Sequence, residues 1–208
     1  EAAAAIKRLK CRKMPGPDNI PAELAKVFPD TFSEAVIQKA NTALLTSIWP
    51  DEWAAARGHA IPKAKAQSSD PSTFRLVAAL STEAKIATYM LLERLKAHLK
   101  PHIPQQQTGF APKTRVEIAV SGTAAFLSNA RDAGRAVLAT TVDIRKAFDT
   151  VNRQTLLGKL EQAGIPPEIL YVLRDYFGKT TVQLPAGDIR YRRGVVQGCV
   201  LSPVLFAL

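Results

Sequence analysis

The sequence predicts an α+β fold in which a small antiparallel sheet packs with helices. Three observations support this fold class. Apolar residues recur at one-face helical spacing in several stretches, and short extended segments flank polar turns. In addition, 47% of the 208 residues are apolar and 22% are charged, which is typical of a globular chain with a hydrophobic core.

Helices are predicted at the start of the chain. Range 1–10 is rich in alanine and favours a helix. A second helix follows Pro21, which suits a first helical turn because its missing N–H has no partner there. A longer helix opens at Ser33, and Ile37 and Leu44 fall on one face of it.

A hairpin and a long helix are predicted next. Segments 58–65 and 74–80 are extended on either side of the polar loop 66–73, whose composition is that of a hairpin tip. The helix that follows begins at Ser81 and continues until Pro101 stops it.

The second half of the chain alternates helices and extended segments in the same way. Its predicted elements are a helix over 116–127, a strand over 136–144, helices over 154–164 and 166–178, a hairpin over 180–195 that turns at 186–188, and a helix start at 202–203.

The net charge of the chain indicates which kind of partner it binds. The 28 Lys and Arg residues against 18 Asp and Glu leave a net charge of +10, which favours a polyanion such as nucleic acid. Cys11 and Cys199 lie far apart and form neither a disulfide framework nor a zinc motif, so an intracellular setting is expected. No apolar run approaches the ~20 residues that a membrane-spanning helix needs, so no membrane partner is expected.

Asp143 is the most informative single residue. Strand alternation predicts that Asp143 faces away from the side on which Val142 and Ile144 lie. A carboxylate there is costly to bury unless a cation, hydrogen bonds or a metal ion compensates it. Two interpretations are open: a metal ligand, or a helix cap or ion-pair partner of Arg145 or Lys146.

Two neighbours of Asp143 have simpler interpretations when they are taken alone. Asp149 precedes a predicted helix and suits a helix cap or an internal ion pair rather than catalysis. Phe148 is one aromatic residue in an apolar segment, and such residues usually belong to the core.

A second motif gives these residues a context. Range 192–206, RRGVVQGCVLSPVLF, contains a Gly-x-x-Gln-Gly turn before a Ser-Pro helix start, and TVDIRKAFDTV at 141–151 precedes it. Together they resemble consecutive sequence blocks of reverse transcriptases, closest to those of non-long-terminal-repeat (LINE-like) retrotransposons. Earlier blocks resemble the same family in the same order: KMPGPDNIPAE at 13–23, the segment at 61–95, and QQQTGFAPKTR at 105–115.

The resemblance implies a polymerase-type architecture of fingers and part of a palm. It assigns 1–103 to the first part of the fingers, 104–151 to the first palm segment, 152–195 to the second part of the fingers and 196–208 to the start of the second palm segment. It also implies an RNA template, a DNA primer and deoxynucleotide triphosphates as partners. Oligomeric state is not indicated.

The resemblance implies roles for seven residues. Asp143 matches the first metal-binding aspartate of a site for two Mg²⁺ ions, and Ile144 lends its backbone carbonyl, since Mg²⁺ prefers hard oxygen ligands. Lys63 and Arg75 match fingers cations that contact the triphosphate, and Lys65 is an alternative to Lys63. For both lysines, a solvated loop charge is an equally good interpretation. The others are Phe148, which matches a steric gate that excludes a 2′-hydroxyl, and Gln197 and Gly198, which match the turn beside the incoming nucleotide.

One block of the family is absent. The aromatic-x-Asp-Asp hairpin that supplies the other metal-binding carboxylates does not occur in the 208 residues, and neither does a thumb. The chain begins at Glu1 and stops at Leu208 within an apolar segment, so we expect a fragment that does not polymerise alone. The alternatives are a group II intron-type or bacterial reverse transcriptase, or a non-catalytic relative that binds nucleic acid. A nuclear location is expected for a eukaryotic element, and a cytoplasmic one otherwise.

Overall fold

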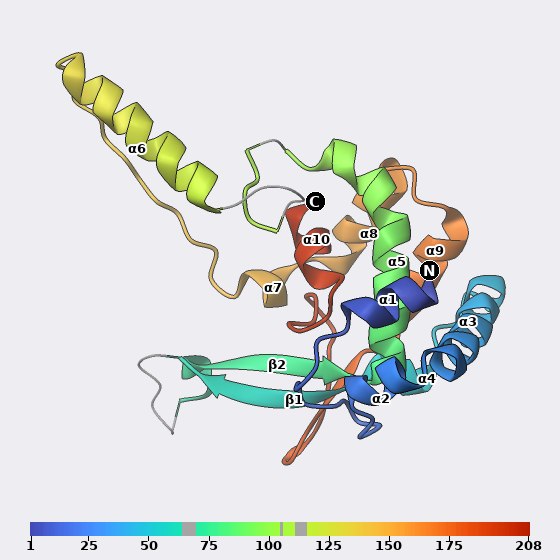
Figure 1. The fold of residues 1–208 in the computed structure, drawn as a ribbon. Coiled ribbons are helices and arrows are strands. Elements are labelled where there is room, and N and C mark those ends of the chain that lie inside the picture. Colours follow the sequence, from blue (N-terminus) through green and yellow to red (C-terminus); the bar gives the residue numbers. More distant parts are fainter. Residues whose placement is uncertain (64–69, 105, 111–115) are drawn as a thin grey trace.

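The α+β fold is confirmed in a computed structural model, which describes residues 1–63, 70–104, 106–110 and 116–208 (Figure 1). The helices are α1 (Ala2–Arg8), α2 (Ala22–Val27), α3 (Pro29–Thr46), α4 (Asp51–Ala54), α5 (Thr82–Leu99), α6 (Val116–Asp132), α7 (Ala147–Thr150), α8 (Arg153–Gln162), α9 (Pro167–Lys179) and α10 (Ser202–Ala207), and the strands are β1 (Ala55–Pro62), β2 (Phe74–Leu80), β3 (Thr181–Leu184) and β4 (Gly187–Arg190).

The four strands form one sheet in the order β2-β1-β3-β4. Two hairpins, β1–β2 and β3–β4, are antiparallel, as the sequence predicts. The pairing of β1 with β3 is parallel, which the predicted antiparallel sheet did not include. Because α5 to α9 lie between these two strands in the chain, β3 enters the sheet from the same end as β1. The sheet therefore joins the two segments that the sequence assigns to the fingers.

The predicted strand over 136–144 is not formed, and the predicted palm segments contribute no strand within the described residues. Leu138 and Val142 are 94% and 90% exposed, Ile144 on the same predicted face is also exposed, and so is Asp143 on the opposite one. The expected alternation of faces around Asp143 is therefore absent. A strand is stable only when a neighbour pairs its backbone groups, and no described segment pairs with this one.

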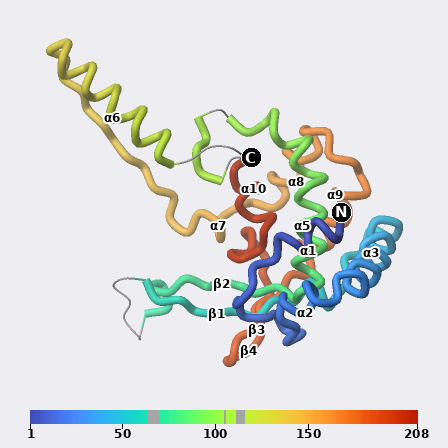
Figure 2. Tube along the Cα trace, viewed as in Figure 1, coloured from blue at the N-terminus to red at the C-terminus, as the bar shows by residue number. Residues whose placement is uncertain are grey.

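The core is built around α5. Its hydroxyl cap forms as predicted, because the Ser81 side chain accepts a hydrogen bond from the Ala84 amide at 3.2 Å. Ile86, Leu95 and Leu99 on this helix are buried, and α1, α3 and α4 pack against it. α9 packs on α3 and α8, so α1, α3, α4, α5, α8 and α9 form one body beside the sheet (Figure 2).

Two helix boundaries differ from the prediction. The long helix predicted from Ser33 begins at Pro29, because proline is favoured at the first helical position. The helix predicted over 116–127 continues to Asp132, and Gly134 follows it with a φ of +66°. No described helix is both long enough and apolar enough to cross a membrane.

α6 and the extended segment after it project away from the other helices (Figure 1). Only Ala130 on this helix is buried, whereas Val120 and Phe126 are each 63% exposed. The extended segment leads from this projection back to Asp143 and α7.

Candidate active site

Six of the seven residues with predicted roles line one pocket. It lies between the β1–β2 hairpin, the segment from Asp143 to Asp149, and the turn at Gln197, and its volume is 690 Å³. Pockets of this size hold small organic ligands. The predicted residues that line it are Lys63, Arg75, Asp143, Ile144, Phe148 and Gln197.

The β1–β2 hairpin positions the two predicted phosphate ligands. Arg75 pairs with Ile61 in the register, and Lys63 lies two residues beyond Ile61, so both cations project from one face of the hairpin. The Lys63 Nζ donates to the Ser72 carbonyl at 2.7 Å, and Arg75 is exposed. Lys65 lies outside the described residues.

Asp143 is exposed in the pocket wall. Within the described part of the chain, its carboxylate accepts no hydrogen bond and forms no ion pair. It does not cap α7 either, because the residue at that position is Lys146, with a φ of +53°. Neither the cap nor the ion pair that the sequence left open is therefore present.

The pocket offers oxygen ligands of the kind that Mg²⁺ prefers. They are the carboxylates of Asp143 and Asp149 and the carbonyl of Ile144. Among the described residues, no group of three or more His, Cys, Asp or Glu side chains gathers at one point. These donors fit a divalent ion in kind and do not complete its octahedral shell.

Phe148 forms part of an aromatic wall. Its ring is stacked on Phe206, with centroids 5.0 Å apart, and meets Phe110 edge-on at 5.8 Å. The backbone carbonyl of Phe148 accepts a hydrogen bond from the Val195 amide at 2.9 Å. The ring is half-buried, so it both packs against the core and faces the pocket.

Gly198 lies beside β2 and does not line the pocket, unlike Gln197. The Gln197 carbonyl accepts a hydrogen bond from the Ala78 amide at 2.7 Å. Gly198 has a φ of +112°, and a Cβ added to it would lie 2.2 Å from the Ala78 carbonyl oxygen. Glycine is therefore required here by the close approach of the turn to the strand.

Eight further residues line the pocket that sequence reasoning did not assign to it: Ser72, Phe74, Leu76, Phe110, Arg145, Lys146, Ala147 and Asp149. A signal was available for Arg145 and Lys146, since both adjoin Asp143 in the motif. With Lys63 and Arg75 they place four cations around two carboxylates, so the pocket favours a phosphate-bearing ligand.

Asp149 has a partner other than the predicted cap or ion pair. The Tyr191 hydroxyl donates to its Oδ1 at 3.3 Å, and the cap of α8 is Asn152 instead. Burial, together with the nearby charge of Asp149 and this hydrogen bond, raises the pKa of Tyr191 to about 12.

The raised pKa of Tyr191 predicts a loss of stability in alkali. In the unfolded chain the Tyr191 phenol ionises near pH 10, whereas in the folded chain it stays neutral to about pH 12. The contribution of Tyr191 to the stability of the fold is therefore complete below pH 10 and is lost as the pH rises towards 12. We expect Tyr191→Phe to make the fall in melting temperature across this interval shallower. Ion pairs of Lys39 and Lys179 are lost in the same range in both proteins, and therefore cancel. Equal slopes for both proteins would show that Tyr191 titrates normally.

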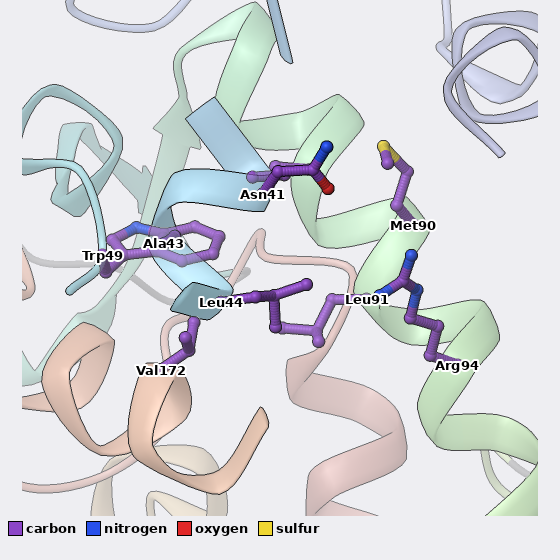
Figure 3. Close-up of a pocket in the computed structure, with 10 residues that line it drawn as sticks. Asn41, Ala43, Leu44, Trp49, Met90, Leu91, Arg94 and Val172 are labelled. Carbon is purple, nitrogen blue, oxygen red and sulfur yellow. The ribbon is translucent and has the colours of Figure 1, made fainter. Parts of the chain in front are cut away.

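A second pocket lacks this chemistry. It lies between α3, α5 and α9, and Figure 3 shows Leu44, Leu91 and Val172 pointing towards it. Its volume is 40 Å³, and Asn41 and Arg94 are the polar residues in its wall. Such a space is too small for a nucleotide, and no carboxylate lines it.

A basic pocket that also contains carboxylates suits a phosphate-bearing ligand. Comparison with known proteins shows to which class the protein belongs. Residues 61–208 match the family described as reverse transcriptase (RNA-dependent DNA polymerase), which is more than half of the chain, and the chain belongs to that family.

Three relatives illustrate the similarity. The Pol polyprotein from type-1 retrotransposable element R2 of Popillia japonica is 29% identical over 78% of this chain and 23% of its own length. The RNA-directed DNA polymerase from mobile element jockey of Drosophila melanogaster is 24% identical over 98% of this chain and 23% of its own length. The 149 kDa protein of transposon TX1 of Xenopus laevis is 27% identical over 100% of this chain and 16% of its own length. The chain thus spans less than a quarter of each, and the predicted resemblance to retrotransposon reverse transcriptases is confirmed.

Proposed function

We propose that this chain forms the nucleotide-binding part of an RNA-directed DNA polymerase that extends a DNA primer on an RNA template during retrotransposition. The observation that supports this is the pocket, because it brings together residues from segments as far apart as Lys63 and Gln197. The names of the relatives point to the same activity. A nuclear location follows if the host is eukaryotic.

In the proposed reaction, Asp143 and the Ile144 carbonyl would hold divalent metal. Bound Mg²⁺ would supply activation of the primer 3′-hydroxyl and neutralisation of charge on the leaving pyrophosphate. The residues of this chain have separate tasks. Asp143 provides a carboxylate that forms no ion pair with any described cation, and it lines the same pocket as Phe148.

The cations of the pocket are proposed to bind the triphosphate. Arg75 presents a planar fork of N–H donors that matches phosphate oxygens, and Lys63 adds a point charge from the same face of the hairpin. Gln197 also lines the pocket, and its side-chain amide is proposed to adjoin the base or sugar of the incoming nucleotide. We propose that 1–103 and 152–195 form the fingers, and that 104–151 and 196–208 belong to the palm.

Phe148 is proposed to exclude the 2′-hydroxyl of ribonucleotides. In the polymerase that contains this chain, Phe148→Ala is expected to lower the preference for deoxynucleotides by about tenfold or more, because the space that the ring occupies opens to the sugar. The measurement is primer extension with each nucleotide type, compared as kcat/KM.

A control separates the gate from the aromatic wall. Phe206→Ala removes the ring that stacks on Phe148 without widening the sugar site directly, so it should reduce stability and leave the discrimination within about threefold. If Phe148→Ala keeps the discrimination of the parent while extension proceeds, the incoming sugar does not lie against this ring.

A further inference from the structure

A second basic groove lies outside the active-site pocket. It is bounded by α8, α9 and the segment from Tyr191 to Gly194, and its volume is 720 Å³. Three arginines, one carboxylate and two glycines in its wall carry the inference. They are Arg153, Arg174, Arg192, Glu161, Gly158 and Gly178, and we call this the arginine groove.

Arg153 is a fixed cation in this wall. Its Nε donates to the Gly194 carbonyl at 2.8 Å, and one terminal nitrogen donates to the carbonyls of Tyr191 and Phe177. The other terminal nitrogen is buried and has no partner in the described part of the chain. Burial lowers the pKa of this guanidinium, and no described carboxylate pairs with it. The groove therefore has a positive charge that is built into the fold.

Arg174 and Arg192 are the exposed cations of the arginine groove, and Arg174 lies over the Tyr171 ring, 5.8 Å from its centroid. Within the described residues neither forms a hydrogen bond or an ion pair. The neighbours of Arg192 differ in this respect: Arg190 donates to the Gly178 carbonyl, and Arg193 donates to the Thr150 carbonyl. Arg192 is thus the arginine of this run that is left for an external ligand.

The two glycines of the arginine groove are unexplained by the fold. Gly158 lies inside α8 and Gly178 in the last turn of α9, where glycine destabilises a helix relative to alanine. A Cβ at either position would meet nothing within 4 Å, and neither has a positive φ. Their small size leaves the helix backbone accessible to a ligand that approaches from outside the chain.

We propose that the arginine groove binds the phosphodiester backbone of nucleic acid, at a second position beside the active-site pocket. Exposed arginines suit phosphates because their donors form a planar fork, and the +10 net charge favours the same ligand. The two sites share a boundary, since Tyr191 bonds to Asp149 of the pocket while Arg192 lines the groove. One strand can thus contact both. The proposal rests on the proposed function only in naming nucleic acid as the ligand.

The test measures binding by the 208-residue chain, with no requirement for polymerisation. Fluorescence anisotropy of a labelled RNA–DNA hybrid duplex is recorded over a series of salt concentrations. Arg174→Gln combined with Arg192→Gln is expected to weaken binding about tenfold or more, and to lower the slope of log affinity against log salt by about 1.8, since each phosphate contact contributes ~0.9.

The matched control removes the same charge elsewhere. Lys10 and Lys26 are exposed and line neither pocket, so Lys10→Gln combined with Lys26→Gln should change the affinity by less than about threefold. Equal losses in the two double variants would overturn the proposal, because they would show that only the net charge matters. Displacement of the hybrid by polyglutamate at equal charge concentration would also overturn it, in favour of an acidic polypeptide.

A second pair of variants tests the close approach. Gly158→Ala should raise the melting temperature and weaken binding of the hybrid by about threefold, because a methyl group then lies between the helix and the ligand. Gly122→Ala on α6 is the control, since a Cβ there also meets nothing within 4 Å and the residue lines neither pocket. It should stabilise the chain without affecting binding. Unchanged binding by Gly158→Ala would show that the nucleic acid does not approach the helix backbone at this residue.

A chain that binds no hybrid at all would overturn the proposal for the arginine groove. A loss of polymerisation alone would concern Asp143 and not the groove.

Discussion

Asp143→Asn is expected to abolish nucleotide addition by the polymerase that contains this chain, with a loss of at least about a thousandfold in kcat, or on the order of 4 kcal/mol of transition-state stabilisation. Asparagine has nearly the same shape and lacks the negative charge that a divalent ion needs. Asp143 is exposed and unpaired, so the substitution breaks no internal contact, and the melting temperature should not change. Primer extension and binding of a template–primer duplex are the two measurements.

The matched control is Asp188→Asn, which removes an exposed carboxylate from the β3–β4 hairpin. It should leave both extension and duplex binding unchanged. Extension by the Asp143→Asn variant at the rate of the parent would remove this residue from the catalytic site. If the unaltered polymerase binds the duplex and never extends it, the non-catalytic alternative is favoured instead.

Gly198→Ala is expected to have a large effect on stability, a loss of about 3 kcal/mol or more in the free energy of unfolding. Two costs add at this position. The φ of +112° is unfavourable for any residue with a Cβ, and the new Cβ would lie 2.2 Å from the Ala78 carbonyl oxygen, so the turn must move away from β2. That movement also breaks the hydrogen bond between the Ala78 amide and the Gln197 carbonyl. Urea unfolding followed by circular dichroism measures the loss.

Gly187→Ala separates the two costs. Gly187 has a similar φ of +124°, and a Cβ there would meet nothing within 4 Å. Gly187→Ala should therefore lower the free energy of unfolding only by the cost of the unfavourable φ, about 1–3 kcal/mol. This loss should be smaller than that of Gly198→Ala by roughly 2 kcal/mol. Equal losses for the two variants would show that the turn at Gly198 does not press against β2.

The functional motifs were predictable because they are local strings of residues. Asp143, Phe148 and Gln197 stand in two blocks whose order identifies the family, and family membership is confirmed. Their assembly was not predictable from either block alone. Lys63, Asp143 and Gln197 meet in one pocket only because the β1–β2 hairpin, the segment before α7 and the turn before α10 converge.

Local sequence determined α5, α8, α9 and the two hairpins, because apolar spacing, caps and turn residues act within a few positions of each other. Tertiary structure alone decided the rest. Range 136–144 has the composition of a strand and is not one, because a strand depends on a partner that no local pattern specifies. The parallel pairing of β1 with β3 and the juxtaposition of Arg153, Arg174 and Arg192 arise likewise from contacts between segments that are distant in the chain.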